Sequence, residues 1–403
     1  MTVAQLTWLD LTASDRDKVR RVLALFHEQG TVDELGLGSL RDTLSNALFP
    51  GTSVLHTRLR YVFFIPWAYQ QIESWGGGHD VGHEGRKLEV ALIDALAASD
   101  DTAGIIGVQA RQTLAQLAST SYWALLVRLG IFAPGKSQGW YHTHFDNLVR
   151  RRNDVGRADD PGVTWTREPT WHPRLPRPPK NFPESISFAV TGEEADFIRG
   201  RIEERSGGTL LSWFAQEGSA TLDKSLWDDP TATRAPAQVL GVLELARRFS
   251  LHVEGAPLLY NLLLAELRGK LEPSERDEKL VNVYRDELSQ WAAREATEAP
   301  FQPDNLWRLA AREGTRLVAP QQRFLESWTR RITEIGPAGV ADDRYLRDLI
   351  SMRERQLKGD QRARVVNRGR LLDWSGRVGT GRMQFRWPQV RQLLVDLHNG
   401  VCN

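Results

Sequence analysis

Basic side chains that could bind phosphate groups are concentrated toward the carboxyl end of the sequence. Residues 351–391 contain eleven Lys or Arg and three Asp or Glu, a local charge of +8 (11 − 3) in a chain of net charge +1. A helix over 343–364 would bring most of these cations onto one face. Such a stripe is typical of proteins that bind nucleic-acid backbones, although a solvated face paired with the chain's own acids explains it as well. The predicted phosphate contacts are Arg344, Arg347, Arg355, Lys358, Arg362, Arg364, Arg368 and Arg370.

Arg353 differs from these cations because the same helical pattern places it in the middle of the apolar face. An unpaired guanidinium at a buried position is very costly. We therefore expect Arg353 to form a structural ion pair rather than to contact a ligand.

A second group of polar residues surrounds the string "LFPGTS". Pro50 and Gly51 suit a turn, and Thr52 or Ser53 could cap a helix that starts at residue 54 and is kinked or ended by Pro66. One interpretation is a core helix held by one ion pair, from Arg58 or Arg60 to Asp42. The other is a pocket for an anionic group such as phosphate at the helix start. The pocket residues would be Arg41, Asp42, Thr52, Ser53, Thr57 and Arg58.

Four histidines carry the imidazole groups that zinc or manganese could use. His79 and His83 stand near Asp80 and Glu84 in a glycine-rich loop, where nothing presets the ligand geometry. His142 and His144 would face together only on a strand. Solvated loops are the favoured interpretation, so we predict no metal and no cofactor.

Signatures of common enzymes are missing from the sequence. It has no G-x-x-x-x-G-K-[ST] phosphate loop and no G-x-S-x-G elbow. This favours a non-enzymatic protein. A metal-dependent hydrolytic effector, a nuclease using the four histidines, is the alternative.

The pattern of apolar residues predicts a mostly α, multi-helical fold. Helices are expected over 12–30, 84–99, 107–119 and 121–132, and Thr191 with Glu194 forms a capping box. Residues 236–250 and 255–270 resemble two packed helices. Strand candidates are few: 186–190 is the best and 383–387 is another. Residues 113–145 could form a winged helix, with a hairpin after the second helix, but that helix is too apolar to read bases.

Changes in composition along the chain suggest four successive regions. These are an N-terminal helical domain (1–152), a proline-rich connector (153–185), a central helical domain (186–340) and a basic C-terminal segment (341–403). Cys402 is the only cysteine, which excludes an intramolecular disulfide. No long apolar run and no signal peptide are present, so no membrane span and a cytoplasmic location are expected.

Several strings resemble an uncharacterised bacterial family known only as a domain of unknown function. The most specific is "DELGLGSLRDTLSNALFPGTSVLHTRLRYVFFIPW", and "SYWALLVRLGIF", "RERQLKGDQRAR" and "FRWPQVRQLLVDL" support it along nearly the full chain. The resemblance implies no activity or catalytic residue. It implies a loose association with bacterial anti-phage islands, beside helicase-like and phospholipase-D-like partners.

Together these features predict a non-enzymatic accessory protein of a bacterial defence system. It would contact the DNA phosphate backbone and a partner protein. A protein–protein scaffold without nucleic-acid contact is a further alternative, supported by the 14 tryptophans.

Overall fold

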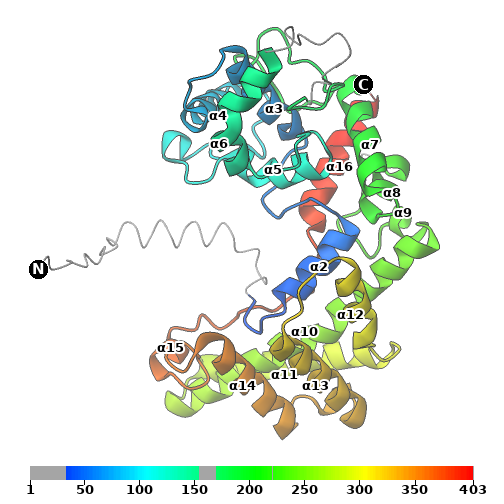
Figure 1. Cartoon of the computed structure of the whole chain (residues 1–403). Coiled ribbons are helices and arrows are strands. Elements are labelled where there is room, and N and C mark those ends of the chain that lie inside the picture. Colours follow the sequence, from blue (N-terminus) through cyan, green and yellow to red (C-terminus); the bar gives the residue numbers. More distant parts are fainter. Residues whose placement is uncertain (1–32, 154–168, 220, 403) are drawn as a thin grey trace, which may run out of the picture. The chain divides into compact units, whose positions relative to one another are not determined.

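The computed structural model describes residues 33–153, 169–219 and 221–402, and these residues fold almost entirely as helices (Figure 1). They form fifteen α-helices and two short 3-10 helices, and their only strand-like pairing is an isolated bridge between Phe132 and Trp171. The predicted mostly α fold is confirmed. The helix expected over 12–30 lies outside the described residues.

Neither strand candidate forms a strand. Residues 186–190 run without regular structure into the cap of the next helix. In 383–387 the extended run is interrupted because Phe385 and Arg386 both have positive φ, at 49° and 67°. Left-handed backbone of this kind cannot continue a strand.

The chain divides into two compact units, each made from two segments that are distant in sequence. Of the described residues, the first unit takes 33–41 together with Leu245–Met383. The second unit takes Asp42–Glu244 and the residues from Gln384 onward. The predicted central domain, 186–340, therefore contributes residues to both units.

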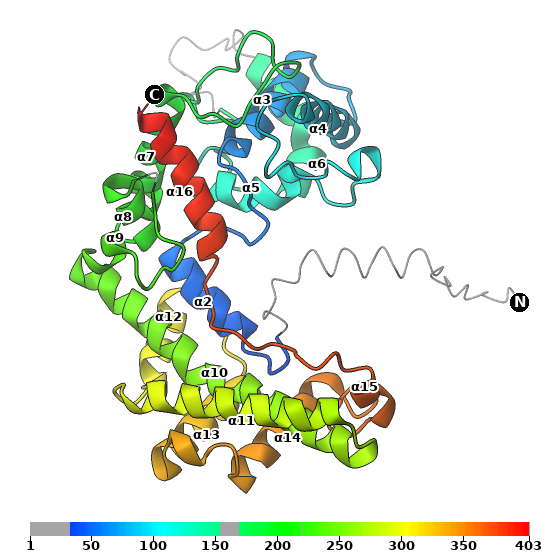
Figure 2. The same cartoon turned by 180° about the vertical axis from the view of Figure 1, so that it is seen from behind.

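The first unit is organised around one long helix, α10 (Ala237–Leu271). Helix α11 (Glu275–Ala296) packs beside it (Figure 2). The prediction of two helices in this stretch is wrong, because α10 continues through Gly255 and Pro257. A Cβ at Gly255 would lie 2.6 Å from the ring of Trp291, so this glycine permits close helix packing instead of ending a helix.

Shorter helices complete the first unit. They are α12 (Pro303–Arg312), α13 (Ala319–Ile335), the 3-10 helix η2 (Pro337–Gly339), α14 (Arg344–Lys358) and α15 (Arg368–Leu372). Helix α14 starts at the cap Asp343, whose side chain accepts from the amide of Leu346, and ends before Gly359, which has φ 71°. It buries Leu346, Ile350 and Arg353.

The second unit is built around α3 (Tyr61–Ser74), whose residues from Tyr61 to Tyr69 are all buried. The helix begins later than the sequence suggests, because residues 54–60 form turns. It also passes through Pro66 instead of ending there. Aromatic rings pack around it, as in the edge-to-face contact of Tyr69 with Trp123 at 5.7 Å. Pairs of this geometry add stability beyond their buried area.

The other helices of the second unit surround this aromatic core. They are α2 (Gly38–Leu48, from Asp42), α4 (Val81–Ala97), η1 (Arg111–Thr113), α5 (Ala118–Arg128), α6 (Gln138–Asn153), α7 (Gly192–Ser206), α8 (Leu210–Glu217), α9 (Pro230–Thr233) and α16 (Trp387–Cys402). Thr191 and Glu194 make the predicted capping box of α7. Helix α16 lies against α7, although the two are far apart in sequence.

The region considered for a winged helix differs from that layout. Residues 107–119 form turns and η1 instead of the expected helix, and α5 begins at Ala118. The segment expected to form the wing hairpin is helix α6. The winged-helix arrangement is therefore not confirmed. Across the described ranges, no helix combines the length and the apolar character that crossing a membrane would need.

Candidate nucleic-acid interface

The eight predicted phosphate contacts lie on α14, on the turn that follows it and on α15. Figures 1 and 2 both show α15 beside the end of α14. The turn folds back because Glu354 accepts hydrogen bonds from the backbone amides of Arg364 and Val365, each at 3.0 Å. Arg362 and Arg364 are thus in the turn, and the helical stripe is shorter than predicted.

Three of the eight cations belong to the internal framework of the first unit. Lys358 bonds Glu34 and lies 2.8 Å from Glu354, and Arg364 lies 2.9 Å from Glu34. Arg347 pairs with Glu266 on α10. All three side chains are at most about a quarter exposed. These contacts connect Glu34 and α10 to α14 and the turn after it. The three cations are therefore largely neutralised by the protein's own carboxylates.

The carboxylate at the centre of this network is completely buried. Glu354 accepts from Lys358 and from the hydroxyl of Tyr260, besides the two amides of the turn. Burial by itself would raise the pKa of Glu354, but the hydrogen bonds from Lys358, Tyr260 and the turn outweigh burial and lower the pKa. The carboxylate is therefore ionised and holds the turn in place.

The other five cations are exposed, and their contacts are weak or solvent-facing. Arg355 lies 2.8 Å from Asp360, which is itself exposed, and Arg362 donates to the carbonyl of Lys358 and forms no ion pair with the described residues. Exposed ion pairs contribute little and are screened by salt, so these guanidinium groups can exchange their partners for phosphate. The exposed cations are Arg344, Arg355, Arg362, Arg368 and Arg370.

A cleft of about 430 Å³ runs between α10 and α14 in the first unit. Its basic lining residues are Lys270, Arg344, Arg347 and Arg355, its acidic ones are Glu266, Asp342 and Asp348, and Leu263, Leu267, Val365 and Val366 add apolar surface. Arg344 at its mouth is 96% exposed, and its nearest acid, Asp348, is 3.9 Å away. The cleft therefore combines exposed positive charge with an apolar wall.

Arg353 is buried as predicted, but its partners are not carboxylates. Its guanidinium donates to the carbonyl of Leu35 at 2.8 Å and to that of Gly36, and it lies 5.5 Å from the ring centre of Phe324. Burial lowers the pKa of Arg353, and the nearby charge of Asp33 opposes this. Arg353 therefore holds the backbone of Leu35 and Gly36 against α14.

The six residues of the predicted anion pocket do not converge on one site. Thr52 donates to the carbonyl of Phe49, and Thr57 donates to that of Gly104. The hydroxyl of Ser53 accepts from the amide of Leu55, which closes a local turn. The hydroxyl groups of Thr52 and Ser53 thus stabilise local turns, and that of Thr57 connects to the loop at Gly104. Arg41 belongs to the first unit and the other five residues to the second.

Arg58 lines a cleft of about 570 Å³ in the second unit, but its charge is neutralised there. Its guanidinium lies 3.0 Å from Asp396 and 2.6 Å from Asp101, and it stacks over Phe188 at 4.4 Å. The cleft is therefore acidic overall, because Asp100 lines it too.

The predicted pairing of Asp42 with Arg58 or Arg60 is not observed. Arg60 instead forms a buried pair with Glu194 at 2.8 Å. Asp42 lies 3.7 Å from Arg386. The partners come from α7 and from the start of α16, which local sequence patterns cannot reveal.

The four candidate metal ligands have separate roles. His142 contacts the hydroxyl of Tyr69 at 3.1 Å, and His144 contacts the carbonyl of Trp140 and stacks on its ring. His79 packs on Trp75, and the amide of His83 is bonded to the cap of α4. Within the described ranges, no three His, Cys, Asp or Glu side chains are grouped as a metal site requires. The nuclease alternative therefore lacks its ligand set there.

Sequence reasoning missed a relay of the order hydroxyl, imidazole, carboxylate in the first unit. His252 contacts the hydroxyl of Thr329 at 2.9 Å and the carboxylate of Glu295 at 2.7 Å, and Arg248 donates to both oxygens of Glu295. The same order of groups activates the nucleophile of serine hydrolases. All four side chains are buried, so no substrate reaches the hydroxyl, and the relay is structural.

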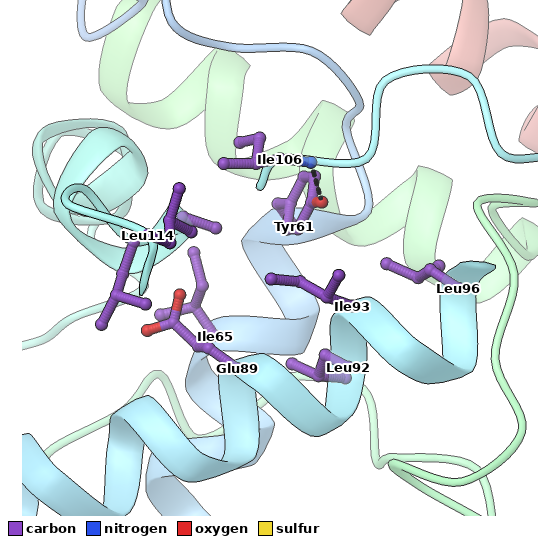
Figure 3. Close-up of a pocket in the computed structure, with 10 residues that line it drawn as sticks. Tyr61, Ile65, Glu89, Leu92, Ile93, Leu96, Ile106 and Leu114 are labelled. Carbon is purple, nitrogen blue, oxygen red and sulfur yellow. Dashed lines mark hydrogen bonds between the residues drawn. The ribbon is translucent and has the colours of Figure 1, made fainter. Parts of the chain in front are cut away.

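A second missed feature is Glu89 on α4, shown in Figure 3. One carboxylate oxygen accepts from the amide of Ser119 at 3.0 Å in the first turn of α5, and the other is buried without a hydrogen-bond partner among the described residues. The adjoining cavity of about 10 Å³ is lined by apolar residues and Tyr61 and has the size of one water molecule. Burial raises the pKa of Glu89 to about 7. The cavity is too small for a substrate.

Comparison with known proteins identifies the family of this chain. The chain belongs to a family of unknown function, DUF6361, whose family model matches residues 3–400. No curated protein and no solved structure matches the chain. The predicted resemblance to an uncharacterised family is therefore confirmed over nearly the full length.

Proposed function

We propose that the first unit binds the phosphate backbone of a nucleic acid and that the protein is a non-enzymatic accessory factor. The observation that carries the proposal is the exposure of five arginines on α14, on the turn that follows it and on α15. Two of them, Arg344 and Arg355, line the α10–α14 cleft. Guanidinium groups bind phosphate with strong, charge-assisted hydrogen bonds, and the displacement of counterions makes such binding depend on salt.

The alternatives have less support from the geometry. The hydroxyl–imidazole–carboxylate relay is inaccessible, and the four histidines are dispersed. The scaffold alternative rested on the tryptophans, but Trp67, Trp291, Trp328 and Trp387 are among the largest fully buried side chains and serve the cores of the two units. An anti-phage role and helicase-like or phospholipase-D-like partners stay predictions. Affinity purification with nuclease treatment tests whether a partner binds directly.

The test is charge reversal at exposed arginines only. The double variant Arg362→Glu with Arg370→Glu removes two proposed contacts, and Arg312→Glu is the matched control, since Arg312 is also exposed and lies on a different helix of the first unit, α12 (Figure 1). Binding of labelled DNA is measured at low and at high salt. Lys358 is unsuitable for this test because its reversal would disrupt the buried network.

We expect the double variant to lose at least about tenfold in affinity at low salt, because each phosphate contact adds to the salt-dependent part of binding. The control should bind like the wild type. Binding that responds neither to salt nor to the double substitution would contradict the proposal.

A further inference from the structure

We infer that the nucleic acid bound by this surface is single-stranded, an inference that rests on the proposed function. The basic face of α14 continues directly into two exposed side chains that carry no charge. Tyr345 is 41% exposed and Met352 is 50% exposed. At 100° per residue they lie on the same flank of the helix, roughly 60–100° around its axis from Arg355 and Arg344. Base-sized apolar surface thus adjoins the proposed phosphate contacts.

Cations from the preceding helix surround the Tyr345 ring. The hydroxyl of Tyr345 accepts from Arg330 at 3.4 Å, and the guanidinium carbon of Arg331 lies 6.0 Å from the ring centre. Arg331 is fixed by Asp343 at 2.6 Å, so the surface around the ring is partly ordered before any ligand binds. Arg330 is 67% exposed, and its ion pair with Glu334, at 3.9 Å, is exposed as well, so a phosphate can compete for this guanidinium.

An exposed aromatic ring among arginines distinguishes between the two forms of nucleic acid. In a duplex the faces of the bases are already stacked on one another, so a surface tyrosine gains nothing from them. In a single strand every base offers a free face, and stacking on an aromatic side chain adds affinity with little dependence on sequence. Arginines beside the ring contribute both phosphate contacts and cation–π contacts.

The cleft between α10 and α14 also favours a single strand over a duplex. Its volume of about 430 Å³ falls in the range of sites that hold one small molecule. It can accommodate a short piece of one flexible strand, with phosphates near Lys270 and Arg344 and sugar or base against Leu267 and Val366. The stiff double helix can touch only the rim of such a cleft.

The experiment compares one fluorescent oligothymidylate of about 20 nucleotides, longer than usual site sizes, with a duplex of equal length. Fluorescence anisotropy gives the dissociation constant of each for the full chain. The variant is Tyr345→Ala, and Trp75→Ala is the matched control, because Trp75 is an equally exposed aromatic residue, 44%, in the second unit. Tyr345→Phe is a second variant that keeps the ring and removes only the hydroxyl.

We expect the wild type to bind the oligothymidylate more tightly than the duplex. Tyr345→Ala should lose about tenfold for the single strand and nothing for the duplex, whereas Tyr345→Phe and Trp75→Ala should keep the wild-type affinities. Equal binding of both forms, or an equal loss of both in Tyr345→Ala, would overturn the inference and leave the proposed function standing. If neither form binds at low salt, the proposed function itself fails.

Discussion

Two regions of this protein are rich in arginine and were both predicted as anion sites, yet their arginines are in opposite states. In the second unit, Arg58 and Arg60 meet carboxylates that are buried with them, Asp396 and Glu194. In the first unit, the arginines at the end of α14 and on α15 meet carboxylates that are as exposed as they are. The difference teaches that the density of basic residues is a poor guide to a binding site. What matters is whether the acidic partner is desolvated together with the base.

The largest expected effect comes from removing a buried arginine, which tests whether burial of the acidic partner makes an arginine structural. Arg60→Ala leaves Glu194 buried and without its partner, and removal of one member of a buried pair typically costs about 3–5 kcal/mol. The free energy of unfolding of the second unit should therefore fall by an amount of this order, as measured by urea denaturation with tryptophan fluorescence. Arg111→Ala is the matched control, because Arg111 pairs with Asp94 on the exposed surface of the same unit. If the two variants were equally stable, burial of the partner would not be the deciding factor.

The next largest effect concerns Glu89, a buried carboxylate of the second unit that forms no ion pair with the described residues. Burial raises its pKa from an ordinary 4.5 to about 7, although Ser119 and the amides at the start of α5, with the charge of Arg86, favour the ionised form. The folded state therefore prefers the proton. The contribution of Glu89 to stability is therefore greatest below about pH 4.5 and is lost as the pH rises toward 7, by about 3 kcal/mol in total.

Glu89→Gln tests this directly, because the amide keeps the shape of the side chain and cannot ionise. The variant should be more stable than the wild type at pH 8, and its stability should vary less between pH 5 and pH 8. Urea denaturation at several pH values measures both. Identical pH profiles for the two proteins would show that Glu89 ionises without cost.

A third prediction compares two cations that the sequence placed in one class. Lys358→Gln leaves Glu354 without a charged partner and Glu34 with Arg364 alone, so the first unit should lose about 1–3 kcal/mol. Arg362→Gln removes the same charge from the surface and should leave stability unchanged while weakening DNA binding. Thermal unfolding and DNA titration of both variants separate the two roles. A large loss of stability in Arg362→Gln would place it in the framework too.

Local patterns in the sequence predicted several of the helices and their ends, but they did not predict which residues pair across the fold. The helical period predicts α14, and it places Arg353 on the buried face; the capping box at Thr191 marks the start of α7. However, the acidic partner of Lys358 and Arg364 is Glu34, which lies more than 300 residues away in the sequence. No local pattern can predict that contact. The predicted break between residues 250 and 255 is absent, and the role of Gly255, its contact with Trp291 of α11, depends on tertiary packing. Whether the α15 arginines are exposed likewise depends on which acidic residues the tertiary fold brings near them.

The smallest expected effect tests the comparison most directly, because the substitution removes an acidic residue and leaves every arginine in place. Asp360→Asn removes the carboxylate that lies 2.8 Å from Arg355 on the surface. Hydrogen bonding to Asp360 is also what raises the pKa of Arg355, so the pair forms a real competitor for phosphate. We expect DNA affinity to rise about two- to threefold at low salt, since exposed pairs are weak, with the gain disappearing at high salt. The equivalent change in the second unit, Asp396→Asn, removes a buried partner of Arg58 and should reduce stability without improving DNA binding. A gain in affinity from Asp396→Asn, or none from Asp360→Asn, would show that exposure of the acidic partner does not decide which arginines are free to bind.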